Sequence, residues 1–353
     1  MLIEGSFAAV TTPFYPDERV YHRKIEANMA HYSRTPLAGM VVLGSTGEAV
    51  TLDDAETRDV LRTAAGATSP EKVLIAGVGR ESLKATVEMA EAAAQFEYDA
   101  VLVRTPTYYS PQISYEAALT YFRSVADRSP LPVLLYHIPK FVPYPMPVEL
   151  VAELAQHPNI IGIKDSSGDL ERIKATIAST RTGPKRTVTV TNIFEAVTAR
   201  MLKPSSAELG QATFVAAGDL AGGIALAAAP PKESIKTRNR GIGFQVLTGA
   251  ASIVLESLEA GAAGAILGFA ACAPQAFHEV YSAWKDHDLK LAAEKQQRIA
   301  GTAKRIVGDF GVSGIKHACD FNGYYGGRPR LPLLPLSAEQ KREIENLLTD
   351  LRN

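Results

Sequence analysis

The sequence has little of several features that mark other classes of protein. Its 353 residues include only two cysteines, and 37 basic and 38 acidic side chains give a net charge of -1 at pH 7. This balance provides no basic field for nucleic acid or for an anionic membrane. Cys272 and Cys319 occur without a CxxC pair or a set of histidine ligands, so we expect reduced, buried thiols and no metal site. A small-molecule substrate is therefore favoured.

Targeting and membrane-spanning patterns are also missing. The apolar stretch at residues 221–229 contains glycines and is much shorter than the about 20 residues that a membrane-spanning helix needs. The first residues, MLIEGSFAAVTTPF, have neither the basic and then apolar pattern of a secretory signal nor the Arg/Ser-rich pattern of a transit peptide. These features predict a cytoplasmic protein.

What the sequence does contain is an alternation of short apolar runs with longer helical patterns. The expected strands lie at residues 7–10, 40–43, 73–76, 100–103, 133–136, 160–164, 244–247 and 265–267. The expected helices that follow them lie at residues 23–33, 53–65, 82–95, 115–127, 147–156, 170–179, 253–259 and 274–285. Eight such units predict an α/β fold, the closed parallel (β/α)8 or TIM barrel, with its site at the carboxyl ends of the strands. No GxGxxG follows the first strand, which disfavours a dinucleotide-binding sheet.

The barrel should occupy residues 1–286, and residues 287–353 should form a helical extension with helices near 292–306 and 338–351. One segment interrupts the barrel: about sixty residues, roughly 183–241, separate the sixth helix from the seventh strand. Because this insertion follows a helix and precedes a strand, it should leave the barrel at the amino end, opposite the chemistry. We expect it to be dispensable for catalysis, as a partly folded or disordered excursion or a gene-model artefact.

The stretch IIGIKDSSG, at residues 160–168, places Lys164 at the end of an apolar run. A buried lysine is rare unless it is paired or functional, and burial favours its neutral, nucleophilic amine. A single lysine at a strand end more often extends its ammonium into water, so this stretch alone does not decide between the two interpretations. The residues at the ends of the other strands are needed to distinguish a functional Lys164 from a solvent-exposed one.

Polar groups occur at the expected ends of three more strands. The second strand leads into GSTGE, in which Ser45, Thr46 and successive backbone N–H groups could hold an anion. The fourth leads into TPTYYSP, with Tyr108 and Tyr109, and the fifth into YHIP, with Tyr136. Each feature has an ordinary alternative, because serine, threonine and glycine are common turn residues and tyrosines commonly belong to cores or interfaces.

The combination is more informative than its parts. One face of the predicted barrel would carry one lysine, tyrosines from two neighbouring strands and a Ser/Thr turn. This is the set of groups that a Schiff-base enzyme needs. His137 should face away from Tyr136 by strand alternation, so we interpret it as structural. No pair of carboxylates stands at matched strand ends and no cluster of metal ligands is present in the sequence, which disfavours a glycosidase and a metal-dependent aldolase.

These motifs resemble the pyruvate-dependent class I aldolases typified by dihydrodipicolinate synthase and N-acetylneuraminate lyase. The resemblance runs through GSFAAVTTPF, GSTGE, TPTYY, YHIP and GIKDSSGD, and resumes at QVLTGAASIV and GAAGAIL beyond the insertion. Within the family, HPNIIGIKDSSGDLERI and FGVSGIKHACDFNGYYGG are most similar to 4-hydroxy-2-oxoglutarate aldolase. Fungal 2-keto-3-deoxy sugar acid aldolases are near relatives. The family implies a TIM barrel, a homotetramer and no metal or organic cofactor.

The resemblance also implies a role for each matching residue. Lys164 would form the Schiff base, Tyr136 would be the general acid/base, and Ser45 and Tyr108 would carry protons to it. The substrate-binding positions would be Thr46 for the carboxylate, Gly249 and Ile266 at the pyruvate pocket, Ser166 facing the rest of the substrate, and Tyr109 as an alternative relay residue.

One departure from the family pattern bears on the substrate. Dihydrodipicolinate synthases place an arginine two residues after the proline of the fifth-strand motif, and here that position is Phe141, beside Lys140. Val142 and Pro143 replace the usual Thr-Gly, so dihydrodipicolinate synthesis is disfavoured. The favoured activity is cleavage of a 4-hydroxy-2-oxo acid, such as 4-hydroxy-2-oxoglutarate, to pyruvate and an aldehyde such as glyoxylate. The alternatives are a 2-keto-3-deoxy sugar acid aldolase or dehydratase, and a catalytically silent barrel that binds a partner.

Overall fold

The computed structural model describes residues 1–193, 195–203 and 235–351. Eight parallel strands close into a barrel in the order β1-β10-β9-β6-β5-β4-β3-β2. The barrel strands are β1 (Gly5–Ala9), β2 (Gly39–Val42), β3 (Val73–Gly77), β4 (Ala100–Arg104), β5 (Val133–His137), β6 (Ile160–Asp165), β9 (Gln245–Thr248) and β10 (Gly264–Leu267). The prediction of a TIM barrel with an insertion and further C-terminal helices is confirmed.

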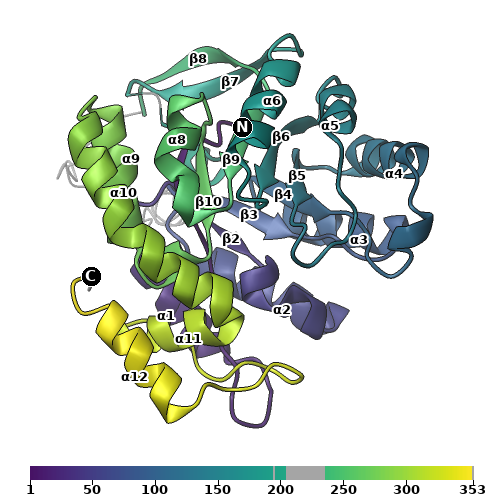
Figure 1. Cartoon of the computed structure of the whole chain (residues 1–353). Coiled ribbons are helices and arrows are strands. Elements are labelled where there is room, and N and C mark those ends of the chain that lie inside the picture. Colours follow the sequence, from purple (N-terminus) through teal and green to yellow (C-terminus); the bar gives the residue numbers. More distant parts are fainter. Residues whose placement is uncertain (194, 204–234, 352–353) are drawn as a thin grey trace, which may run out of the picture.

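Helices surround the barrel, as Figure 1 shows. They are α1 (His22–Ser33), α2 (Asp54–Ala67), α3 (Leu83–Gln95), α4 (Tyr115–Arg128), α5 (Val148–Leu154), α6 (Leu170–Thr180), α8 (Val254–Glu259) and α9 (Pro274–Lys285). Several begin at a side chain that accepts a hydrogen bond from the first turn: Asp53 forms a capping box with Glu56, and Ser82, Ser114 and Asp169 cap α3, α4 and α6. These local signals explain why the helix starts could be predicted closely.

The strands are buried almost throughout, since their side chains pack either inside the barrel or against the helices. Every residue of β6 is buried, including Lys164 and Asp165 at its carboxyl end. The apolar runs in the sequence therefore correspond to strands that are covered on both faces.

The described part of the insertion lies at the amino end of the barrel. Two of its segments, β7 (Arg186–Thr191) and β8 (Thr237–Ile242), pair as a separate antiparallel sheet. Arg186 donates to the carbonyls of His157, Pro158 and Ile160, which precede or begin β6. Arg200 pairs with Asp99, just before β4. The remainder of the insertion, residues 204–234, lies outside the described residues, so the expectation about its order is not addressed.

The pairing of Thr191 with Thr237 indicates how the insertion can be removed. Replacing residues 192–236 with Asn-Gly should close β7 and β8 as a two-residue hairpin. We expect a folded protein that retains turnover within about threefold, because the contacts described for the removed residues, such as those of Thr198 with Pro70 and of Arg200 with Asp99, lie at the amino end. Circular dichroism and the rate of pyruvate release check this. Removing only residues 204–234 is the control, and a folded but inactive hairpin variant would show that the insertion takes part in catalysis.

The C-terminal extension covers the opposite, carboxyl side of the barrel. It contains α10 (Leu289–Ala303), a π-helical turn (Lys304–Asp309), α11 (Gly311–Phe321) and α12 (Ala338–Leu347). It lies beside α1 and α2 in Figure 1, where Tyr325 exchanges hydrogen bonds with Asn28 and Arg330 pairs with Glu56. The predicted helix 292–306 is thus two elements, and α11 was not predicted as a separate helix. Among the described residues, no helix is both long and apolar enough to cross a membrane.

Candidate active site

Three neighbouring strands place Arg104, Tyr136 and Lys164 side by side. Arg104 of β4 is in register with Tyr136 of β5, which is in register with Lys164 of β6. Residues paired in this way direct their side chains to the same face of the sheet. The Nζ atom of Lys164 lies 4.4 Å from the centre of the Tyr136 ring. The structure therefore brings the predicted nucleophile to the predicted acid/base residue.

Lys164 is only 4 % exposed, so it does not extend into water as the ordinary alternative required. No carboxylate lies within ion-pair distance of it among the described residues. The adjacent Asp165 is engaged elsewhere, since it accepts from Ser167 and pairs with Arg172 at 2.7 Å. A desolvated lysine amine beside a phenol is a suitable arrangement for attack on a carbonyl.

His137 is in register with Asp165, not with Lys164, as the alternation along β5 predicted. Burial lowers the pKa of His137 to about 4, although Asp165 opposes the shift. The imidazole is therefore neutral at pH 7. This position agrees with the structural role expected from the sequence.

The GSTGE turn stands beside these residues. Ser45–Gly47 forms a single 3-10 turn after β2, and Ser45 Oγ lies 3.5 Å from the Tyr136 hydroxyl, at the long limit of a hydrogen bond. Thr46 is partly exposed, and its hydroxyl lies so close to Gly268, after β10, that a Cβ there would come within 3.0 Å of it. Leu43, just before the GSTGE turn, and Glu48, its last residue, have left-handed backbone angles of φ 60° and 54°. Non-glycine residues adopt this conformation only when their surroundings hold them there.

A buried ion pair holds Glu48. Lys316 of α11 lies 2.5 Å from its carboxylate, and both side chains are essentially inaccessible to water. The other carboxylate oxygen accepts from the backbone N–H of Arg330. Lys316 also donates to the carbonyl of Arg328 and lies over the ring of Phe14. Burial lowers the pKa of Lys316, and Glu48 opposes the shift.

Sequence reasoning missed this connection between the C-terminal extension and the turn. The signal that could have found it is Lys316 itself, which stands among apolar residues in GVSGIKHAC. That is the same kind of signal that drew attention to Lys164.

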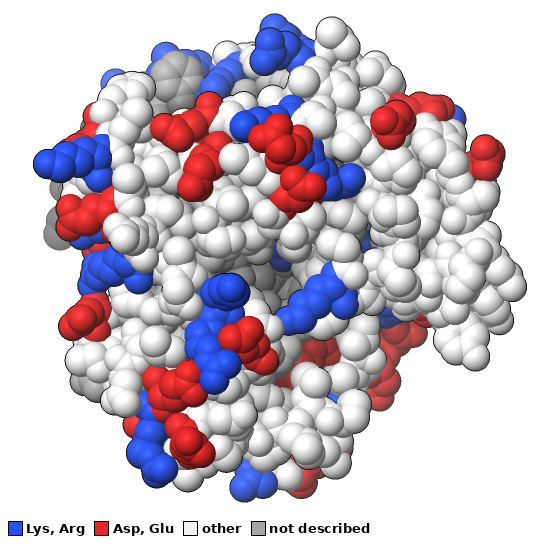
Figure 2. Space-filling view, in the orientation of Figure 1, with Lys and Arg blue, Asp and Glu red and all other residues white. Residues whose placement is uncertain are grey.

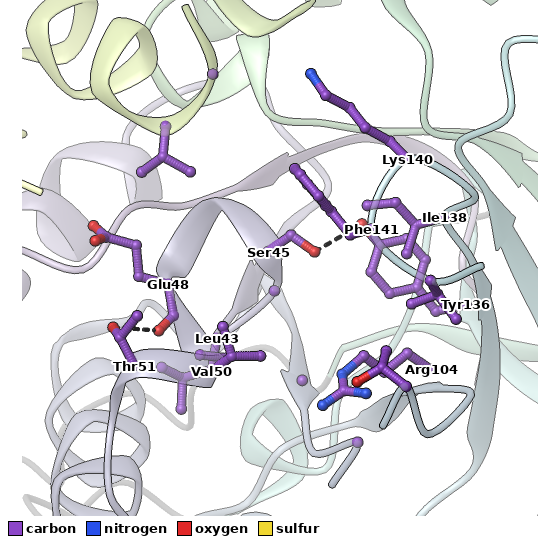
Figure 3. A pocket seen from close by; sticks show the side chains of 18 of the residues that line it. Leu43, Ser45, Glu48, Val50, Thr51, Arg104, Tyr136, Ile138, Lys140 and Phe141 are labelled. Carbon is purple, nitrogen blue, oxygen red and sulfur yellow. Dashed lines mark hydrogen bonds between the residues drawn. The ribbon is translucent and has the colours of Figure 1, made fainter. Parts of the chain in front are cut away.

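A cavity of about 550 Å³ opens over the turn and Tyr136. Figure 3 shows Ser45, Val50 and Glu48 on one side of it and Tyr136, Ile138 and Phe141 on the other. The extension completes the wall with Phe310, Gly311, Val312, Ser313, Pro332 and Leu333. Lys164 does not line this cavity, but its Nζ atom lies over the ring of Tyr136, which does. Figure 2 shows a hollow near the centre of the face seen there, with basic side chains beside it.

The structure brings only some of the residues expected to bind substrate close to one another. Ser166 and Gly249 are in contact at the ends of β6 and β9, since a Cβ at Gly249 would fall 1.9 Å from Ser166 Oγ, so no larger residue fits. Ile266 is fully buried in β10. Their expected roles stay predictions.

Tyr108 and Tyr109 are not brought to the site in this chain. They are 80 % and 64 % exposed, contact each other edge to face, and do not line the cavity. The relay roles suggested by the resemblance therefore have no support from contacts within the chain. Within the described residues, no group of three or more His, Cys, Asp or Glu side chains is placed to hold a metal ion.

Comparison with known proteins decides the family. The family model described as "Dihydrodipicolinate synthetase family" matches residues 2–203 and 222–351. The chain belongs to this family. Among curated relatives, a 4-hydroxy-tetrahydrodipicolinate synthase of Acidiphilium cryptum is 26% identical over 350 residues, covering 99% of each chain.

Solved members of the dihydrodipicolinate synthetase family have the same fold. YagE of E. coli K12, in complex with pyruvate, has a TM-score of 0.77 at 24% identity and covers 99% of each chain. The chloride-inhibited dihydrodipicolinate synthase of Acinetobacter baumannii, complexed with pyruvate, has a TM-score of 0.77 at 25% identity, again over 99% of each chain. These likenesses show the fold, and the match to the family model shows the family. The finer resemblance to 4-hydroxy-2-oxoglutarate aldolase, the homotetramer and the cytoplasmic location stay predictions.

Proposed function

We propose that the protein is a Schiff-base lyase that cleaves a 4-hydroxy-2-oxo acid, such as 4-hydroxy-2-oxoglutarate, to pyruvate and an aldehyde such as glyoxylate. The observation that carries the proposal is the placement of the buried Lys164 amine against the Tyr136 ring, whose hydroxyl lies 3.5 Å from Ser45 Oγ. The pyruvate complexes of two family relatives support a 2-oxo acid as the substrate class.

The proposed steps follow from these positions. The Lys164 amine adds to the C2 ketone and water leaves, which gives an iminium. Tyr136 passes its own proton to Ser45, which at the same time gives its hydroxyl proton to water in the cavity, and the resulting phenolate accepts the proton of the C4 hydroxyl. The O–H electron pair forms the aldehyde, and the C3–C4 pair moves into the iminium to give an enamine. Protonation at C3 and hydrolysis release pyruvate and free lysine. Thr46 and the backbone N–H groups of its turn would hold the substrate carboxylate, and the steps use no metal or organic cofactor.

Two measurements test the proposal. Borohydride added with pyruvate should trap a covalent adduct, which mass spectrometry of peptides should place on Lys164. A panel of hydroxy-oxo acids, scored by pyruvate release, should then show cleavage of 4-hydroxy-2-oxoglutarate. A folded protein that traps no pyruvate would exclude the Schiff-base mechanism, and the silent barrel would take its place.

The Tyr136→Phe variant separates proton transfer from Schiff-base formation. We expect turnover to fall about a hundredfold or more, because the phenol is the proposed acceptor of the C4 proton, while the pyruvate adduct still forms. Single-turnover cleavage and trapping of the same sample provide the measurement. Phe122→Leu, a core change in α4 away from the cavity, is the control for general packing effects. Unchanged turnover in Tyr136→Phe would remove the role assigned to Tyr136.

A second candidate is synthesis of 4-hydroxy-tetrahydrodipicolinate, because the Acidiphilium relative bears that name. At the position where such synthases carry an arginine, this chain has Phe141, which is 54 % exposed at the cavity. Product analysis with pyruvate and aspartate semialdehyde distinguishes the two candidates. The same panel, extended to 2-keto-3-deoxy sugar acids, distinguishes a sugar-acid aldolase from a dehydratase.

A further inference from the structure

The cavity wall contains two basic residues, Arg104 and Lys140, and one acid, Glu48, among the residues that the structure describes. The carboxylate of Glu48 is already neutralised by Lys316. Most other lining side chains are apolar, such as Leu43, Val50 and Leu102. Arg104 and Lys140 are therefore the two cations that the described wall offers to an anionic group at the far end of a substrate.

Arg104 is the better placed of the two. Its position in register with Tyr136 puts it two strands from Lys164, and strands are about 4.8 Å apart. Figure 3 shows Arg104 and Tyr136 on the same side of the cavity. Gly79 gives the side chain its space, since a Cβ there would lie 2.8 Å from Arg104 Cγ. A substrate joined to Lys164 and lying across Tyr136 would thus extend toward this guanidinium.

Neighbouring groups orient the guanidinium of Arg104 and leave some of its N–H donors available for a ligand. Its side chain is 15 % exposed, and it donates to Glu81 at 2.9 Å and to the carbonyl of Thr105 at 3.1 Å. A guanidinium has five N–H donors, so three remain that no described residue accepts. Two parallel N–H groups of an arginine match the geometry of a carboxylate.

Glu81 fixes the arginine in place. Partial burial raises the pKa of the Glu81 carboxyl. Hydrogen bonds from the backbone of Tyr108 and Thr107, from Arg104 and from the Thr107 hydroxyl outweigh this effect and lower that pKa to about 2. The carboxylate therefore stays ionised at neutral pH. It ties Arg104 to the loop after β4, so the guanidinium does not have to be ordered by the substrate.

Lys140, in contrast, is exposed and already donates to the carbonyl of Gly308 at 2.6 Å. Binding a substrate through its ammonium would compete with that bond. Lys140 therefore provides a matched control for a cation that lines the same cavity.

We propose that Arg104 binds a carboxylate at the far end of the substrate and so selects dicarboxylic 2-oxo acids. The inference rests on the proposed function, since it takes Lys164 as the anchor at the C2 carbon. It assigns the terminal carboxylate of a five-carbon diacid to Arg104 on β4. Phe141, which stands on the loop after β5 where synthases carry an arginine, has no charge that could bind it.

The test compares 2-oxoglutarate with 2-oxopentanoate, which has the same chain length but no terminal carboxylate. Titration calorimetry gives the Kd of each acid for the wild type, Arg104→Met and Lys140→Met. We expect the wild type to bind 2-oxoglutarate more tightly. Arg104→Met should weaken that binding about a hundredfold and change the Kd of 2-oxopentanoate little, because it removes charge-assisted hydrogen bonds. Lys140→Met should leave both values nearly unchanged.

Equal weakening of both acids in Arg104→Met would overturn the inference, as would a wild type that does not prefer 2-oxoglutarate. A larger selective effect in Lys140→Met would overturn it in favour of that lysine. Because the readout is binding, it is independent of cleavage. A wild type that binds 2-oxoglutarate through Arg104 but releases no pyruvate from hydroxy-oxo acids would contradict the proposed function and leave the inference standing.

Discussion

The Lys164→Arg variant should form no pyruvate adduct and should lose turnover by about 10⁴-fold or more, the scale seen when a covalent nucleophile is removed. Arginine keeps the positive charge and nearly the same length, but its guanidinium is never deprotonated in proteins and cannot add to a ketone. Borohydride trapping followed by intact-mass measurement, together with pyruvate release, checks both parts of this expectation.

The control for this variant is Lys140→Arg, which changes a lysine at the cavity rim by the same substitution. It should trap pyruvate at the rate of the wild type. Calorimetric unfolding of both variants tests whether the loss in Lys164→Arg comes from misfolding. An adduct of undiminished yield in Lys164→Arg would mean that another lysine is the nucleophile, and peptide mapping would identify it.

Replacing Lys316 with methionine should destabilise the protein by about 3–5 kcal/mol, because it leaves the Glu48 carboxylate buried without its partner. Methionine is similar in length to lysine and suits the surroundings of a side chain that contacts the ring of Phe14. Urea unfolding at pH 7 measures the change. The variant should also bind pyruvate more weakly, since Glu48 ends the turn that carries Ser45 and Thr46.

A double-mutant cycle isolates the pair itself. Glu48→Gln in the Lys316→Met background removes the unpaired charge and should recover a large part of the lost free energy of unfolding. Ile315→Val, at the neighbouring position of α11, serves as the control for packing and should cost only about 1 kcal/mol. Additive effects of the two substitutions would show that Lys316 and Glu48 do not interact energetically.

The barrel could be predicted from the sequence because its signals are local. Each strand is a short apolar run, and four of the eight barrel helices begin at a capping side chain, among them α2 at Asp53 and α3 at Ser82. The strand-end rule then placed Lys164, Tyr136 and Ser45 on one face, and the structure brings these three together. Counting strands and helices also placed the insertion at the amino end, where Arg186 contacts the start of β6.

Other features depend on packing between distant segments, which local patterns do not encode. The ion pair of Lys316 with Glu48 joins residues 268 positions apart, and nothing near either residue specifies the other. The cavity wall formed by Phe310 and Leu333 likewise depends on how the extension folds back. Arg104 was hidden for a different reason: it immediately follows the apolar run of β4, so its register with Tyr136 became visible only once the strand boundary was known.

The contribution of the extension to the cavity has a consequence for synthesis of the chain on the ribosome. When residue 267 has been added, all eight strands have been made, but Lys316 and the cavity wall at residues 310–313 and 332–333 have not. Chains fold from the N-terminus as they emerge, so a nascent barrel would hold the Glu48 carboxylate without its counter-ion. The extension, which is translated after the barrel strands, therefore both closes the site and neutralises its turn, so a chain that has not yet reached it does not present a complete cavity.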